Sequence, residues 1–297
     1  MADIDTSSLP AGVTLVEGRG GLPALRVNTP ACTGEVYLLG AHVTQWTPAG
    51  AEPVLWMSEK SHFEAGSPIR GGVPICAPWF GPGKSGDLTP AHGWFRTATW
   101  SLASAEGEAD GDTVSLTFTL DGRDAEVPEG ASRGVRGEYT VTFGSALGLS
   151  LTVTSDDPLE LEEALHTYLA VSDISEVTVE GLDGTRYVDK APGGRAVNAQ
   201  QGALKFLRET DRVYGHEGSA SVVDPGKGRR IAVEKEGSGS TVVWNPWSAK
   251  AAAMPDFGDD EWRGMVCVEV ANALSKSVSL EAGGSHTIKA AYSVSAL

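Results

Sequence analysis

Hydrophobic and polar residues alternate along much of this chain with the period of two that is typical of β-strands. Apolar residues occupy every second position of Thr113–Leu120, which places them all on one face of a strand. Glu138–Phe143 and Leu147–Thr154 repeat this alternation on either side of Gly144–Ser145. Two alternating runs joined by a short turn-forming link predict a β-hairpin.

Similar short runs, separated by turn residues, continue to the end of the chain. They predict strands at Leu22–Val27, Glu35–Leu39, Ala41–Trp46, Val54–Trp56, Leu161–Val171, Glu176–Glu180, Ser219–Val223, Arg230–Lys235, Ser240–Trp244, Met265–Val270, Ser277–Leu280 and Thr287–Val294. Helical periodicity is scarce, and Ser248–Met254 can form one or two turns before Pro255. Without a repeat or a linker, this pattern predicts one all-β antiparallel sandwich over residues 1–297, with residues 1–12 as a loose N-terminal segment.

Charge and composition narrow the classes of partner. A hydrophobic content of 41% is enough to bury a core, and the net charge is −16. An acidic surface of this size repels nucleic acid and anionic membranes, so we expect neither as a partner. A site for an anionic substrate must therefore create its own local positive charge.

The cysteines indicate a reducing environment. Cys32, Cys76 and Cys267 are widely separated, odd in number and without paired spacing, so we expect no disulfide and no zinc site. The chain starts without the basic and apolar pattern of a secretory signal, and it has no apolar run of membrane-spanning length. We therefore expect a cytoplasmic protein.

The stretch Arg70–Arg96 is dense in glycine, proline and aromatic residues, which indicates an irregular backbone. Arg70, His92 and Arg96 lie among these apolar neighbours. A guanidinium group can form two hydrogen bonds to the oxygens of one phosphate. Lys84 is either a third cation or simply exposed; the glycines around it lack the spacing of a phosphate-binding P-loop. The stretch is either the wall of a cationic pocket or an ordered loop with solvated arginines.

Two polar residues are isolated within apolar strand patterns, where an unpaired ionisable group is costly. His166 follows Ala164–Leu165, and Glu269 lies within Met265–Val270. They can form a general acid–base pair if their strands are neighbours. The alternatives are a hydrogen-bonded core histidine and a structural salt bridge. Asp211 is a further polar candidate, or else a turn residue.

Several motifs occur in an order that resembles the glucose-6-phosphate 1-epimerases, the hexose-6-phosphate mutarotases of the aldose 1-epimerase superfamily. The resemblance extends from about Val54 to Leu297. Its motifs are Pro68–Cys76, Pro78–Gly81, His92–Arg96, Leu165–Tyr168 with Asp173–Ile174, Gly181–Lys190, Thr210–Tyr214, Val243–Trp247 and Val266–Asn272. One departure is Ala77, where the family usually has a bulky aromatic residue, and we expect it to alter the pocket wall.

The resemblance implies a galactose-mutarotase-like antiparallel β-supersandwich that uses no cofactor and no metal. It implies that the protein interconverts the α and β anomers of hexose 6-phosphates, most directly glucose 6-phosphate, and works as a monomer. By position, His166 matches the general acid and Glu269 the general base. The substrate-binding positions match Arg70, His92, Arg96 and Asp211.

Three other functions remain open from the sequence. A mutarotase of unphosphorylated aldoses shares the fold, although Arg70 and Arg96 favour a phosphate. A non-catalytic carbohydrate-binding module has no need of an isolated acid and base. A carbohydrate hydrolase or lyase usually needs two carboxylates across the bond, and Glu269 alone is prominent.

Overall fold

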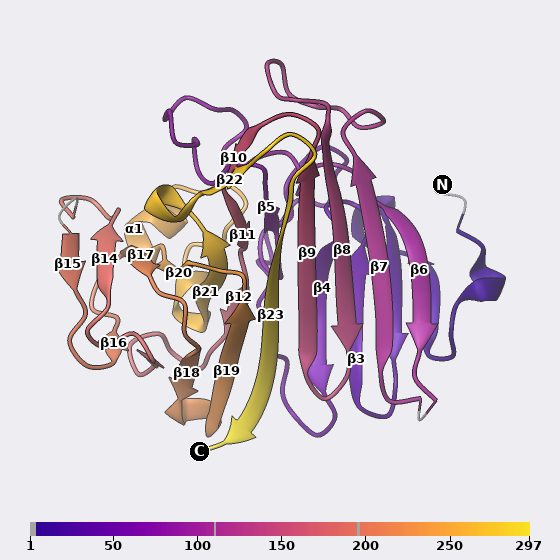
Figure 1. Cartoon of the computed structure of the whole chain (residues 1–297). Coiled ribbons are helices and arrows are strands. Elements are labelled where there is room, and N and C mark those ends of the chain that lie inside the picture. The colour runs from indigo at the N-terminus through magenta and orange to yellow at the C-terminus, as the bar shows by residue number, and fades with distance from the viewer. Residues whose placement is uncertain (1–3, 110, 195–196) are drawn as a thin grey trace.

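β-Strands dominate the computed structural model, which describes residues 4–109, 111–194 and 197–297 (Figure 1). The strands are β1 (Val13–Glu17), β2 (Pro23–Asn28), β3 (Cys32–Tyr37), β4 (His42–Pro48), β5 (Ile75–Cys76), β6 (Ser101–Gly107), β7 (Val114–Asp121), β8 (Val135–Phe143), β9 (Leu147–Ser155), β10 (Leu159–Leu161), β11 (Glu163–Leu165), β12 (Tyr168–Ala170), β13 (Thr178–Glu180), β14 (Arg186–Asp189), β15 (Val197–Ala199), β16 (Leu204–Lys205), β17 (Thr210–Gly215), β18 (Ala220–Asp224), β19 (Arg229–Glu236), β20 (Ser240–Asn245), β21 (Met265–Asn272), β22 (Val278–Leu280) and β23 (Ser285–Ala296). The helices are α1 (Trp247–Ala252) and the short 3-10 turns η1 (Thr6–Ser8), η2 (Arg19–Gly21), η3 (Pro225–Lys227), η4 (Glu261–Gly264) and η5 (Leu274–Lys276).

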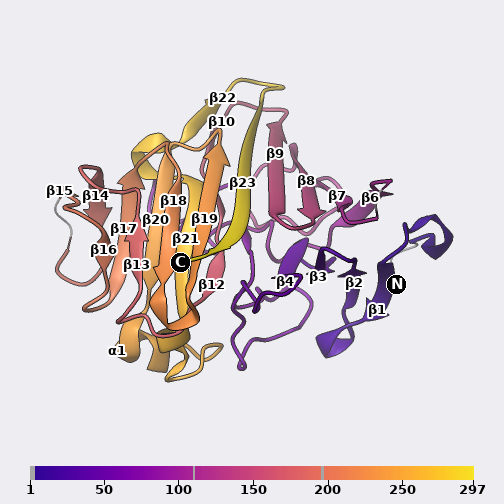
Figure 2. The same cartoon turned by 90° about the horizontal axis from the view of Figure 1, so that it is seen from below.

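Antiparallel sheets form two layers, which Figure 2 shows from below. The front sheet has the order β16-β13-β18-β19-β23-β9-β8-β7-β6. Behind it lies the site sheet, β15-β14-β17-β20-β21-β11-β5, in which β12 also pairs with β21. A four-stranded sheet, β1-β2-β3-β4, joins the site sheet through a bridge between Val43 and Val73. The all-β antiparallel prediction is confirmed.

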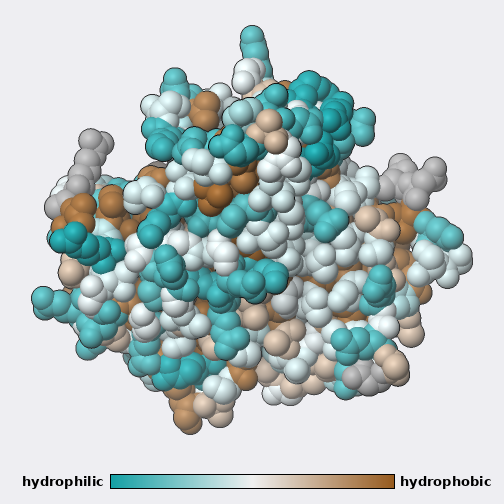
Figure 3. Space-filling view, in the orientation of Figure 1, coloured by the Kyte–Doolittle hydropathy of each residue, from teal (hydrophilic) through white to brown (hydrophobic). Residues whose placement is uncertain are grey.

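The front sheet follows the alternating pattern of the sequence. The apolar positions of β7 are buried and its polar positions are half-buried, and β8 and β9 form the predicted hairpin, with Phe143 opposite Leu147. The outer face of this sheet is mostly neutral or hydrophilic (Figure 3). The buried faces of the layers form a continuous hydrophobic core that includes residues from Val13 to Tyr292.

Some elements differ from the prediction. Val54–Trp56 forms only an isolated bridge at Leu55, and Leu161–Val171 is split into β11 and β12 instead of a single strand. At the split, the Thr167 N–H donates to the Leu165 carbonyl within the segment, whereas the N–H groups of His166 and Tyr168 donate to the carbonyls of Pro74 and Gly72. Most of the strands that the prediction missed lie in polar or exposed segments, where alternation is weak; they are β1, β6, β14, β15, β16 and β17. The prediction also missed β5, which is buried but only two residues long, and it covered β10 only at Leu161.

Side chains at the split point alternate between the two faces of the site sheet. The Thr167 hydroxyl forms a 2.6 Å hydrogen bond with the Tyr292 hydroxyl of the front sheet. Its neighbours His166 and Tyr168 therefore point the other way, onto the face that the Arg70–Arg96 loop covers. Within the described ranges, no helix is long and apolar enough to cross a membrane.

Candidate active site

Neighbouring strands of the site sheet carry polar and aromatic residues in one row. Antiparallel pairing places Asp211 opposite Trp244, Trp244 opposite Cys267, and Cys267 opposite Tyr168. Directly paired residues project from the same face of a sheet, and so do residues two positions apart. Glu269 therefore shares the face of Cys267.

His166 lies directly across from Glu269. Leu165 pairs with Val270 and Tyr168 with Cys267, so one unbroken register places His166 opposite Glu269. The His166 Nε2 atom is 3.4 Å from Glu269 Oε1, and the His166 ring stacks on Tyr168 at a centroid distance of 4.9 Å. The sequence left open whether these two strands are neighbours, and the fold makes them so.

A cavity of about 290 Å³ lies over this pair. All six residues that the sequence predicted for the site line it: Arg70, His92, Arg96, His166, Asp211 and Glu269. The rest of the lining is Phe80, Ala91, Tyr168, Lys190, Val242, Trp244, Lys250 and Met254. The volume is near the lower end of small-ligand sites, roughly 300–1,000 Å³, which suits a monosaccharide better than an oligosaccharide.

Burial controls the proton state of the facing pair. Burial, followed by the charge of Asp211, raises the pKa of Glu269 well above its ordinary value. Burial, followed by the charges of Arg96 and Arg70, lowers the pKa of His166. These opposed shifts favour a shared proton on Glu269 over one on His166 in the free site. Both Glu269 oxygens and His166 Nδ1 are buried without a hydrogen-bond partner among the described residues, so they are available to a polar ligand.

His92 lies beside the pair as a neutral imidazole. Its Nδ1 accepts a hydrogen bond of 3.3 Å from the Gly81 N–H, so Nε2 carries the ring proton and can donate it. Burial and the nearby Arg96 lower the pKa of His92 well below its ordinary value. Its ring centroid is 5.7 Å from that of His166. His92 is thus a candidate hydrogen-bond donor to a sugar oxygen.

The two predicted arginines differ in their partners. Arg70 forms an ion pair with Asp256 at 2.9 Å and donates to the Tyr168 hydroxyl at 2.9 Å. Arg96 donates to the Ala91 carbonyl at 2.7 Å, and its Nε is buried without a partner. Because Asp256 already balances Arg70, Arg96 has the greater capacity to bind an added anion.

The sequence interpretation missed Lys190, which lines the cavity directly after β14. Its Nζ lies 5.1 Å from the centroid of the Phe80 ring, and no described carboxylate is within ion-pair distance. Lys250 lines the cavity too, but it forms a 3.0 Å ion pair with Glu209. Lys84, the other lysine considered, pairs with the exposed Glu160 away from this cavity. Lys190 and Arg96 are therefore the two cations best placed to receive an anion.

Ala77 does not form part of the pocket wall, contrary to the expectation from the sequence. It is fully buried in the core, and its carbonyl accepts hydrogen bonds from the Trp94 and Phe95 N–H groups. The three cysteines, Cys32, Cys76 and Cys267, are free and buried.

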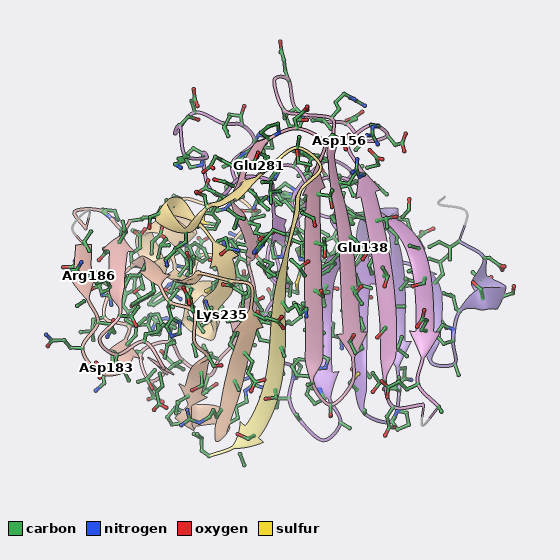
Figure 4. All side chains as sticks on the ribbon, viewed as in Figure 1. Glu138, Asp156, Asp183, Arg186, Lys235 and Glu281 are labelled. Atoms are coloured by element: carbon green, nitrogen blue, oxygen red, sulfur yellow. The ribbon has the colours of Figure 1, made fainter. Side chains whose placement is uncertain are left out.

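A larger hollow of about 510 Å³ lies on the outer face of the front sheet, near Glu138 (Figure 4). Its cation Arg136 is already paired with Asp156. In the described part of the chain, none of its lining side chains is both buried and unpartnered. This hollow therefore lacks the buried, unpartnered ionisable groups that characterise the cavity over Glu269.

Comparisons with known proteins agree with this geometry. Residues 23–293 match the family model described as aldose 1-epimerase. The chain is 38% identical to a protein of Escherichia coli K12 over 255 residues, covering 85% of this chain and 84% of the relative. It is 37% identical to a protein of Cenchrus ciliaris over 265 residues, covering 85% and 78%. Both relatives are named "Putative glucose-6-phosphate 1-epimerase".

Solved structures show the same fold. A crystal structure from Salmonella typhimurium, described as a "putative mutarotase", superposes with a TM-score of 0.82 at 29% identity and covers 96% of this chain and 97% of its own. A galactose mutarotase-like protein from Clostridium acetobutylicum superposes with a TM-score of 0.70 at 11% identity, covering 98% and 100%. The galactose-mutarotase-like architecture implied by the resemblance is confirmed.

Proposed function

This chain belongs to the aldose 1-epimerase family of isomerases, and we propose that it interconverts the α and β anomers of hexose 6-phosphates. One observation carries the proposal. A buried histidine and a buried carboxylate, His166 and Glu269, lie 3.4 Å apart beneath a monosaccharide-sized cavity whose lining also includes cations without a carboxylate partner among the described residues. The names of the relatives support glucose 6-phosphate as the first substrate to test.

The reaction needs one base and one acid at the anomeric carbon. Glu269 as carboxylate takes the proton from the O1 hydroxyl, and protonated His166 gives a proton to the ring oxygen O5 as the C1–O5 bond breaks. Both oxygens are bonded to C1, so neighbouring groups can reach them together. Rotation about C1–C2 turns the other face of the aldehyde toward the hydroxyl on C5. Ring closure with the reverse proton transfers gives the other anomer and restores both groups.

The proton of the pair occupies different positions in the two stages. The cyclic sugar needs the proton on His166, whereas the open aldehyde leaves it on Glu269, the position that burial favours in the free site. Arg96 and Arg70 lower the pKa of His166 in the free site. A phosphate bound to these cations offsets their charge and therefore favours protonated His166. Substrate binding thus assists the acid that ring opening requires.

The 6-phosphate serves as a handle remote from C1. Arg96 and Lys190 are the free cations of the cavity, and Arg70 adds a third positive charge that is fixed by Asp256. Charge-assisted hydrogen bonds to phosphate orient the sugar for both half-reactions. His92 and Asp211 remain for sugar hydroxyls, because one can donate from Nε2 and the other offers carboxylate oxygens.

Anomer exchange measured by NMR on glucose 6-phosphate tests the assignment. His166→Ala and Glu269→Gln are each expected to reduce catalysed exchange by about 10²–10⁴-fold, the usual contribution of a general acid or base. Lys84→Ala is the matched control, since Lys84 is exposed and paired outside the cavity. Exchange at the unmodified rate in both variants would remove His166 and Glu269 from the mechanism.

A mutarotase of unphosphorylated aldoses is the second candidate, because the acid–base pair does not itself contact the phosphate position. The free cations Arg96 and Lys190 favour the phosphorylated substrate. Comparing kcat/KM for glucose and glucose 6-phosphate discriminates between the two. A higher value for glucose would replace the proposed substrate class while leaving the acid–base assignment intact.

A further inference from the structure

Three side chains with metal-ligand chemistry come together beside the cavity, which His166 and Glu269 line and behind which Cys267 is buried. His166, Cys267 and Glu269 each offer one ligand atom, and these atoms all lie within 4.8 Å of one another. Cys267 and Glu269 share one face of β21 because they are two residues apart, and His166 faces Glu269 from the next strand. His166 lies far from Cys267 and Glu269 in the sequence, so no motif spacing indicates the cluster.

The spacing of the cluster matches that of a tetrahedral zinc site. Histidine nitrogen and carboxylate oxygen bind zinc at about 2.0–2.1 Å, so two such ligands on a tetrahedron are about 3.3 Å apart. His166 Nε2 and Glu269 Oε1 are 3.4 Å apart before any ion binds. A zinc–sulfur bond of about 2.3 Å requires the thiol to be about 3.6 Å from the other ligands. The 4.8 Å limit on the cluster thus leaves a shift of about 1 Å at most for Cys267.

The surroundings of the cluster favour a ligand from outside. Both Glu269 oxygens are buried, without a hydrogen-bond partner among described residues, and Glu269 is 1% exposed. The cavity leaves a fourth position open, as catalytic zinc sites do. A carboxylate and a thiolate together would balance the two positive charges of the ion.

The same surroundings select the class of ion. Arg96 and Lys190 line the cavity and repel cations, so a weakly held hard ion is disfavoured. Thiolate and imidazole ligands select borderline or soft ions such as Zn²⁺ and Co²⁺ over Mg²⁺ and Ca²⁺. Binding ionises the Cys267 thiol and displaces any proton that Glu269 carries, and the released protons pass to the solvent. Affinity is therefore expected to rise with pH.

We propose that His166, Cys267 and Glu269 bind a thiophilic divalent cation, and that the bound ion inhibits the epimerase by occupying its acid–base pair. The binding site stands on geometry alone. The inhibition rests on the proposed function, since it requires that this pair perform the reaction.

Titration of the whole protein with Co²⁺ tests the binding site directly. A cobalt–thiolate bond gives a charge-transfer absorption band in the near ultraviolet, and we expect this band in the unmodified protein and its loss on adding Zn²⁺. Cys267→Ala and Cys267→Ser should both lose the band and weaken binding by about 100-fold or more, because even outer-shell partners contribute about 10–100-fold. Two variants are used so that a folding defect in one does not decide the result.

Cys76→Ala is the matched control. Cys76 is also a buried thiol of the site sheet, on β5, but it lies outside the cluster. This variant should keep the cobalt band with unchanged affinity. A band that is absent from the unmodified protein, or that persists in both Cys267 variants, would overturn the site.

Anomer exchange in the presence of Zn²⁺ tests the inhibition. We expect reversible inhibition that competes with the sugar, is relieved by a chelator, and is weakened in Cys267→Ala relative to the activity of that variant without zinc. Cobalt binding at Cys267 without zinc inhibition would overturn the inhibitory part of the proposal. If the unmodified protein catalyses no exchange of any hexose or hexose phosphate, the proposed function fails, whereas the cobalt band still reports on the site.

Discussion

At the scale of single residues, the site combines groups that the sequence singled out with one that it did not. His166 and Glu269 are conspicuous in the sequence because each is an ionisable residue between apolar neighbours. Lys190 directly follows the partly buried strand β14 and is itself exposed, and a lysine in such a position is ordinary. Its importance arises from position alone, since Lys190 and Arg96 are the cavity cations without a carboxylate partner in the described part of the chain. The contrast between a residue and its apolar neighbours singled out the pair that we propose for proton transfer, but not all the cations that we propose for phosphate binding.

Removing Arg96 or Lys190 should weaken recognition of the phosphate selectively. A hydrogen bond to a charged group contributes about 1.5–3 kcal/mol, which corresponds to roughly 10–100-fold in KM. Arg96→Ala and Lys190→Ala are expected to raise KM for glucose 6-phosphate by about this factor and leave KM for glucose unchanged. Steady-state anomer exchange with both sugars measures the difference, and Lys84→Ala serves as control. An equal rise in KM for both sugars would show that these cations do not recognise the phosphate.

The pH profile should reflect the opposed pKa shifts of the pair. Below the lowered pKa of His166 both groups are protonated and the base is lost; above the raised pKa of Glu269 neither is protonated and the acid is lost. Catalysed exchange of glucose 6-phosphate is therefore expected to stay flat through pH 6.5, the ordinary pKa of histidine, once ionisation of the phosphate is corrected for. Exchange NMR across the pH range measures it. A transition centred at the ordinary histidine pKa would contradict the assigned proton states.

At the scale of elements, the Arg70–Arg96 loop depends on close backbone contacts that suit glycine. Gly93 has φ = +71°, and a Cβ there would lie 1.9 Å from the Ala77 carbonyl oxygen. This contact places the next residues so that the Trp94 and Phe95 N–H groups bond the same carbonyl. The adjacent His92 also has a positive φ, of 68°, and its N–H donates to Gly81. Loop geometry therefore determines where His92 and Arg96 face the sheet.

Replacing Gly93 tests this dependence against a glycine with similar φ and no close contact. Gly86 has φ = +86° and open space around a built Cβ. Gly86→Ala is expected to cost about 1–2 kcal/mol of unfolding free energy, from the left-handed backbone alone. Gly93→Ala should cost about 1–3 kcal/mol more because of overpacking, and should lower activity. Denaturant unfolding of both variants measures these free energies. An equal loss of unfolding free energy in the two variants would contradict a role for the close contact between Gly93 and Ala77.

At the scale of the whole molecule, the front sheet supports the site from behind. Thr167 stands between His166 and Tyr168 and reaches through the core to Tyr292 of β23, whereas its neighbours face the cavity. The catalytic segment is thus anchored to the opposite layer at its point of irregular pairing. The front sheet contributes rigidity to the site without lining the cavity.

Removing this anchor should affect stability and activity together. Tyr292→Phe deletes one buried hydrogen bond, which is expected to cost about 1 kcal/mol of unfolding free energy and to lower kcat a few-fold by loosening His166. Tyr139→Phe is the matched control, because the Tyr139 hydroxyl is buried without a partner among the described residues and its removal should cost little. Denaturant unfolding and anomer exchange measure both effects. A Tyr292 variant that behaves like the Tyr139 variant would show that the anchor is dispensable.

The sequence alone determined the all-β class and most strands of the front sheet, and it singled out the two residues that we propose as acid and base. It could do so because both signals are local. Period-two alternation, and an ionisable residue flanked by apolar residues, can each be recognised from adjacent positions in the sequence. Only the tertiary structure decided that His166 lies opposite Glu269 and that Cys267 lies beside this pair. It also decided that Arg70 forms an ion pair with Asp256, whereas Lys190 has no carboxylate partner among the described residues. These relations depend on strand register and on contacts between distant segments, which no local pattern encodes.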